Sequence, residues 1–245
     1  ALVATGVYND VLTVEDPDWR PREHEKYYYR SHTWSEVGWV PDTKKYGHTF
    51  FVEPDSILQA KYGIAKGDIR ALYEKACEIY DKVYPEDVSK PGHSFDNLTD
   101  SVNPLKRFIR YHIMNRYVPG ADKMTSMMIP EHGGYPFGFD YEKVNPTEWF
   151  VTLLPHTMLK VSMLTMNRDE QGRDCRGTDR DKVKRHFINR RYGETSDYQI
   201  RGALVDNKVE SDYQHDAVNG HYFYVDDLVV FSEEVQNKVQ NMRIR

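Results

Sequence analysis

The chain has 245 residues, of which 39% are hydrophobic and 29% are charged, so it has the composition of a globular protein with one large domain or two small ones. A formal net charge of −5 argues against a general nucleic-acid binder, which would present a basic face. The sequence contains no stretch of about 18 consecutive apolar residues, the length that a membrane-spanning helix needs.

The first quarter of the chain mixes a helix, a long loop and a strand. Residues 1–12 have apolar side chains at roughly helical spacing. Residues 13–47 are rich in proline, charge and aromatic rings without a period, which indicates a long ordered loop or insertion. Residues 48–54 are a short apolar run ending in proline, typical of a buried strand. Asp55 is predicted to cap a short helix that stops at Gly63.

Two clearer helices follow, separated by a predicted loop at residues 84–103. The first runs from Asp68 to about Val83 with one apolar stripe, which needs a partner surface. The second begins at Asn103, which can cap a helix, and continues with Pro104 at a position that helices tolerate.

After Met114 the pattern changes to strands. Asn219-Gly220 followed by an aromatic run favours a type I′ turn and therefore predicts a hairpin. Because helices precede strands, the predicted fold class is α+β rather than alternating α/β. The β-favourable runs before the hairpin lie at 124–129, 148–154, 158–164, 187–191 and 198–205, interrupted by a charge-dense stretch at 167–185.

Five segments occur in an order that resembles the fasciclin domain family. They are ALVATGVYNDVL (1–12), TFFVEPDS (49–56), LKRFIRYHIM (105–114), TLLPHTMLKVSM (152–163) and NGHYFYVDDLVVF (219–231). The resemblance implies a wedge of two β-sheets with flanking helices over residues 1–231. Residues 232–245 would then be a C-terminal helical extension or the start of a linker to further domains.

The chain departs from this family at three places. Two insertions, at about 13–47 and 167–195, are absent from minimal members, and Tyr222-Phe223-Tyr224 replaces the usual His-containing aliphatic run. Insertions of this length look most like those of bacterial surface lipoproteins. The resemblance implies an extracellular or cell-surface location, with other domains and any membrane anchor outside this segment, and a surface protein or polysaccharide as partner.

Motifs of common enzymes and cofactor sites are not found in the sequence. It has no GxSxG, GxGxxG, Walker A, HExxH or CxxC motif, so no catalytic residue, metal or cofactor is predicted. Ten histidines could still meet in space without meeting in sequence. Cys77 and Cys175 leave one disulfide or two free thiols equally open.

The family resemblance marks Tyr111, His112 and Asp216 as candidate binding residues. In related animal domains the Tyr-His pair is associated with integrin binding. The favoured alternative is that His112, beside Phe108 and Ile109 on the apolar face, is a buried imidazole hydrogen-bonded to a backbone group. Asp216 occupies the Asp-Ile position of the family, and the favoured alternative is a turn-stabilising aspartate.

The aromatic-rich insertion at 13–47 offers a second candidate binding surface. Aromatic rings suit stacking on sugars or packing into a protein interface, although the favoured alternative is that they attach the loop to the core. The candidate residues are Trp19, Tyr28, Trp34 and Trp39.

These observations predict a non-catalytic adhesion or binding module. The alternatives are a glycan-binding surface protein that uses the aromatic insertion, a surface hydrolase with a site assembled from scattered His and Asp/Glu, and a spacer. A hydrolase requires a concave pocket with convergent titratable groups, whereas an adhesion module is expected to show an exposed apolar or aromatic patch without such a pocket.

Overall fold

The computed structural model describes seven segments of the chain. The fold class within them is α+β, as predicted, with two four-stranded sheets and a helical part. The insertion at 13–47, the predicted strand at 124–129 and the extension at 232–245 lie outside the described residues. The seven segments are residues 1–11, 48–115, 147–165, 184–189, 203–205, 216–217 and 220–230.

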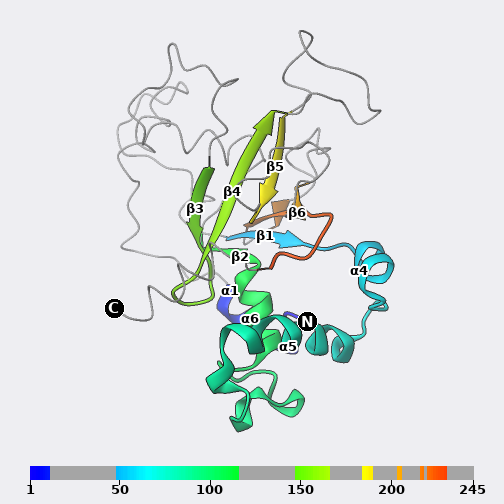
Figure 1. The fold of residues 1–245 in the computed structure, drawn as a ribbon, viewed down its shortest axis with the longest axis vertical. Coiled ribbons are helices and arrows are strands. Elements are labelled where there is room, and N and C mark those ends of the chain that lie inside the picture. The colour runs from blue at the N-terminus through cyan, green and yellow to red at the C-terminus, as the bar shows by residue number, and fades with distance from the viewer. Residues whose placement is uncertain are drawn as a thin grey trace.

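The two helices predicted to begin at Asp68 and Asn103 are present, and each begins directly after its predicted cap. Helix α5 (Ile69–Val83) begins after Asp68, whose side chain accepts a hydrogen bond from the Ala71 amide at 2.9 Å. Helix α6 (Pro104–Tyr111) begins after Asn103. In Figure 1 both helices lie below the strands. None of the helices in the described ranges has the length and apolarity needed to cross a membrane.

The shorter helical segments differ in detail from the prediction. Helix α1 covers only Val7–Val11, preceded by turns. Helix α4 (Asp55–Tyr62) has Pro54 at its N-cap, so Asp55 is its first residue and not its cap, whereas Gly63 ends it as predicted. The predicted loop at 84–103 contains three 3-10 helices, which are η1 (Pro85–Asp87), η2 (Pro91–His93) and η3 (Phe95–Asn97).

The first sheet joins the early and late parts of the chain. Strands β1 and β8 are parallel neighbours, from His48 opposite Gly220 to Val52 opposite Tyr224, and the other two pairings are antiparallel. The order of its strands is β2 (Ile113–Met114), β1 (His48–Val52), β8 (Gly220–Tyr224) and β7 (Asp216–Ala217).

Strands β7 and β8 form the predicted hairpin, but its turn differs from the predicted one. Ala217 pairs with Gly220, so Gly220 is the first residue of β8 and not a turn residue. The connection is therefore formed by residues 218–219, which lie outside the described residues. The predicted turn at Asn219-Gly220 is wrong by one position, because a two-residue loop must lie between the paired positions.

The second sheet is antiparallel throughout, and one of its strands lies within the predicted insertion at 167–195. Strand β5 lies inside that range and pairs with neighbours on both sides. Phe187 and Ile188 in this strand are buried, and both belong to the β-favourable run predicted at 187–191. The strand order is β3 (Thr147–Val151), β4 (Met158–Thr165), β5 (Lys184–Ile188) and β6 (Ala203–Leu204).

One hydrophobic core connects both sheets to the helices. Phe51 of β1 stacks on Phe223 of β8, with ring centroids 6.0 Å apart. The same core includes Tyr80 of α5, Phe108 of α6 and Leu159 of β4. Burial of this many large side chains is the main favourable contribution to folding, and it fixes α6 against the sheets.

Candidate functional site

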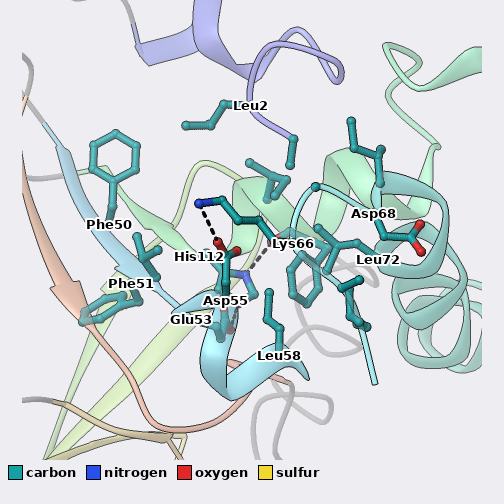
Figure 2. A pocket seen from close by; sticks show the side chains of 18 of the residues that line it. Leu2, Phe50, Phe51, Glu53, Asp55, Leu58, Lys66, Asp68, Leu72 and His112 are labelled. Carbon is teal, nitrogen blue, oxygen red and sulfur yellow. Dashed lines mark hydrogen bonds and ion pairs between the residues drawn. The ribbon is translucent and has the colours of Figure 1, made fainter. Parts of the chain in front are cut away.

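A cavity of about 430 Å³ lies where β1, α4, α5 and α6 meet (Figure 2). Its volume falls within the range of about 300–1,000 Å³ that is usual for ligand sites. The wall is mostly apolar, so it suits an apolar group better than a sugar. The apolar side chains that line it come from Leu2, Phe50, Phe51, Val52, Leu58, Ile64, Ile69, Leu72, Phe108, Ile109 and Ile113.

The loop between α4 and α5 forms one edge of the cavity because two glycines let it turn. Gly63 has φ +70° and Gly67 has φ +79°, in the left-handed region that favours glycine. A Cβ at either position would meet no atom within 4 Å, so the backbone conformation and not crowding selects glycine there. Between them Ile64 is buried, and the exposed Ala65 and Lys66 also line the cavity.

The charged groups beside the cavity are exposed to solvent. Nζ of Lys66 lies 3.8 Å from Oδ2 of Asp55, and their side chains are 87% and 54% exposed. Figure 2 shows the Lys66 side chain extending to the Asp55 carboxylate, while the Asp68 carboxylate points away from both. An ion pair this exposed contributes about 0–1 kcal/mol, so its groups are available to a charged partner.

Glu53 and His112 form a buried pair at the wall of the cavity. Nε2 of His112 lies 2.7 Å from Oε1 of Glu53, and Nδ1 lies 2.7 Å from the carbonyl oxygen of Phe108. A carbonyl oxygen only accepts, so Nδ1 carries a proton. The contact with Glu53 needs a second proton, which the ring and the carboxyl group share. Both ring nitrogens of His112 are therefore engaged. The contact of Nδ1 with the Phe108 carbonyl agrees with the alternative favoured from the sequence, a buried imidazole hydrogen-bonded to a backbone group.

Tyr111 is held in the core by its hydroxyl group. The side chain is fully buried, and its hydroxyl donates to the Met158 carbonyl at 3.0 Å and accepts from Nδ2 of Asn189 at 2.9 Å. Burial raises the pKa of Tyr111 well above its ordinary value, because the phenolate would be desolvated. Tyr111 thus has no exposed side chain to offer to a partner, and it joins α6 to the second sheet.

The side chains of the remaining candidate residues lie outside the described part of the structure. Asp216 lies in the edge strand β7, opposite His221, and its side chain is outside the described part of the structure. Of the two candidates whose side chains the structure describes, Tyr111 and His112, His112 borders the cavity. The aromatic candidates Trp19, Tyr28, Trp34 and Trp39 lie outside the described residues.

A second group of polar side chains lies away from the cavity, between α5 and η2. One side-chain ligand atom each of Cys77, Asp81 and His93 lies within 4.8 Å of the other two. Cys77 has a free thiol, and Cys175 is outside the described residues. Among the described residues this group is the one whose ligand types and spacing could hold a metal ion.

The site residues that carry no signal in the sequence are those that long-range packing assembles. Glu53 is an ordinary residue after a strand, and Lys66 belongs to a surface loop. Cys77 and Asp81 are four residues apart on a helix, which places them on one face. No local pattern, however, indicates that His93 returns to that face.

Comparison of the chain with protein-family models, with curated proteins and with solved structures finds no match. The function is therefore inferred from the cavity and its buried pair, together with the order of segments in the sequence.

Proposed function

We propose that the chain is a non-catalytic binding module that recognises a surface protein by accepting an apolar side chain into the cavity. The observation that carries this proposal is the apolar cavity of about 430 Å³ with exposed charges beside it. Interfaces derive much of their affinity from a few apolar or aromatic anchors that fill pockets inside a polar rim. The cavity supplies the pocket, and Lys66, Asp55 and Asp68 supply charges near it.

We further propose that the module has the fasciclin-like wedge as its fold. Support comes from the way the resembling segments lie together in space. The 49–56 segment contributes β1, the 219–231 segment contributes β8 beside it, and the 105–114 segment contributes α6 with its Tyr-His pair. Segments that are distant in sequence therefore lie around one core.

A protein partner fits the cavity better than a polysaccharide does. Sugar rings carry hydroxyl groups that need hydrogen bonds, and burying them against an apolar wall would leave those groups unpaired. The glycan alternative depends on Trp34, Trp39 and their neighbours in the insertion, outside the described residues. It remains an alternative that the binding experiment below distinguishes.

A hydrolase is disfavoured by the engagement of the titratable pair beside the cavity. A general acid or base needs a nitrogen or oxygen that reaches the substrate. Both nitrogens of His112 are engaged, and Oε1 of Glu53 also accepts from the Val229 amide at 3.0 Å. These contacts suit the pair to holding the wall of the cavity in place.

The proposed setting is extracellular or at the cell surface, with the ligand on a neighbouring protein. If the source is bacterial, the parent protein would be an anchored outer-membrane lipoprotein with further domains. The membrane would be reached only through an anchor outside this segment. Nucleic acid is not a partner in this proposal, because the formal net charge is −5.

The test is a binding screen of the purified protein against surface and extracellular-matrix proteins and polysaccharides, with two tryptophan variants. Ala65 is exposed and lines the cavity, so Ala65→Trp is expected to obstruct its mouth. Ala60 is also exposed but lies in α4 away from the lining, so Ala60→Trp is the matched control.

The expected result is binding to one protein with affinity at least tenfold lower in Ala65→Trp and unchanged in Ala60→Trp. Protein binding that is equal in the two variants would contradict the use of the cavity. Polysaccharide binding that disappears in a folded Trp34→Ala/Trp39→Ala variant would establish the glycan alternative instead. Release of new reducing ends from a polysaccharide would establish the hydrolase.

A further inference from the structure

Three metal-ligating side chains of different chemistry converge beside helix α5. Cys77 and Asp81 lie one helical turn apart on α5, and His93 comes from η2. Nε2 of His93 lies 2.8 Å from Oδ1 of Asp81, and the three ligand atoms lie within 4.8 Å of one another. A thiol, a carboxylate and an imidazole thus meet without any CxxC or HExxH motif.

The backbone that presents His93 is fixed from two sides. The Tyr73 hydroxyl donates to the His93 carbonyl at 2.8 Å, and Nδ2 of the fully buried Asn103 lies 3.4 Å from the same oxygen. The Tyr73 ring also meets the His93 ring edge-on, with centroids 6.4 Å apart. Such outer contacts orient a ligating histidine and reduce the entropy lost on binding a metal.

The spacing of the three groups is close to that of a tetrahedral site. With bonds of about 2.0–2.3 Å, neighbouring zinc ligands lie about 3.3–3.7 Å apart. The ligand atoms of Asp81 and His93 need to move slightly apart as a metal replaces the proton that they share. The Cys77 sulfur needs to move toward them by about 1 Å or less. The side chains of His93 and Asp81 are 14% and 34% exposed, so an ion and a fourth ligand from solvent can reach them.

The chemistry of the cluster favours a metal over a nucleophilic cysteine. Burial raises the pKa of the Cys77 thiol, the Tyr73 hydrogen bond opposes this, and the nearby Asp81 and Glu74 carboxylates add to the increase. Such a thiol is a poor nucleophile. A bound dication would instead be balanced by one thiolate and one carboxylate, and binding would release the thiol proton.

We propose that Cys77, Asp81 and His93 bind a zinc ion with the fourth position open. Sulfur and imidazole select zinc and related transition metals over magnesium and calcium, which prefer oxygen. The bound ion would connect α5 to the segment at 84–103. This site is separate from the cavity, so its test does not depend on the proposed function.

The test uses the full chain with Cys175→Ser, which leaves Cys77 as its one thiol, because the sequence has two cysteines. The reduced, chelator-treated protein is titrated with Zn²⁺ by calorimetry and with Co²⁺ by absorption. Thiolate-to-cobalt charge transfer in the near ultraviolet reports the Cys77 sulfur directly. One equivalent of each metal is expected to bind, and Mg²⁺ is expected to compete with neither.

Cys77→Ser is expected to abolish the charge-transfer band, and Asp81→Asn and His93→Gln are expected to weaken zinc binding at least tenfold. Circular dichroism establishes which variants are folded, and Cys77→Ser changes the side chain least. Absence of the cobalt band in the parent chain would overturn the proposal. Zinc affinity that is equal in the parent and a folded Cys77→Ser or His93→Gln variant would overturn it as well, because other histidines would then hold the metal.

Discussion

Oε1 of Glu53 lies 2.7 Å from Nε2 of His112 and joins the end of β1 to the end of α6. The same oxygen accepts a hydrogen bond from the Val229 amide at 3.0 Å, in the segment that follows β8. One carboxylate group therefore connects three parts of the chain at the wall of the cavity. The His112 and Glu53 side chains are 6% and 7% exposed, so water cannot easily replace these contacts.

Glu53→Ala is expected to lower the free energy of unfolding by about 3–5 kcal/mol, because it leaves His112 and the Val229 amide without their buried partner. Glu53→Gln keeps the shape and one acceptor, so a smaller loss is expected. Urea denaturation measures both. Lys66→Ala breaks the exposed pair with Asp55 and serves as the control, with a change below about 1 kcal/mol. Equal losses in Glu53→Ala and Lys66→Ala would show that the buried pair does not hold the fold.

The starts of α5 and α6 could be predicted from the sequence because helix caps are local. Asp68 and Asn103 each accept a hydrogen bond from an amide within three residues, so nearby side chains decide where the helices begin. The chain reversal at Gly63 is equally local, since its positive φ selects glycine. The α+β class followed from the order of such elements.

The cavity could not be predicted, because long-range packing assembles it. The contact between Glu53 and His112 joins residues 59 positions apart, and no local pattern encodes it. The β-favourable run predicted at 187–191 overlaps strand β5 (Lys184–Ile188) only at Phe187 and Ile188, which are buried. Its first residues, Lys184 and Arg185, were assigned to the charge-dense stretch at 167–185, because a charged strand end gives no apolar pattern.

Tyr111→Phe is expected to destabilise the protein by about 1–3 kcal/mol, because the Met158 carbonyl loses the hydroxyl donor and Nδ2 of Asn189 keeps only the Val230 carbonyl as acceptor. The control is Tyr8→Phe, since the Tyr8 side chain is 47% exposed, and no change in thermal stability is expected there. Thermal unfolding compares the two. A Tyr111→Phe protein as stable as the parent would mean that the hydroxyl contacts contribute nothing net.

Asp87→Asn is expected to remove a stabilisation that depends on pH. Oδ2 of Asp87 lies 2.5 Å from Nη2 of the buried Arg107. Burial opposes ionisation of Asp87, but hydrogen bonds from Lys90 and Arg107 outweigh it and lower its pKa. A lowered folded-state pKa gives stability that is fully present above about pH 4, the ordinary range of aspartate, and is lost as the pH falls through the folded value.

At pH 7 the free energy of unfolding of the parent is therefore expected to exceed that of Asp87→Asn by about 3 kcal/mol, because the substitution breaks a buried ion pair. This difference is expected to shrink as the pH falls and Asp87 of the parent is protonated. Urea unfolding at a series of pH values measures the gap. The exposed Asp55→Asn serves as the matched control and is expected to show a small gap at every pH. A gap between the parent and Asp87→Asn that stays constant down to low pH would exclude the ion pair as its origin.

Asn103→Ser is expected to loosen the segment at 84–103 while leaving α6 in place. A serine hydroxyl can replace Oδ1 as acceptor for the Leu105 amide and so keep the cap. It cannot replace Nδ2, which lies 3.0 Å from the Ser94 carbonyl and 3.3 Å from that of Gly92. The expected loss is about 1–3 kcal/mol, because the carbonyl of the buried Gly92 loses this donor and the Ser94 carbonyl keeps only the Asn97 amide.

Hydrogen exchange distinguishes the two roles of this side chain. Amides between 91 and 97 are expected to exchange faster in Asn103→Ser, and those of α6 at the parent rate, because local opening follows the contacts that are lost. Asp68→Ser is the matched control, since it replaces the cap of α5 by the same residue and is expected to leave residues 91–97 unchanged. Faster exchange throughout α6 would instead mean that Asn103 acts mainly as a helix cap.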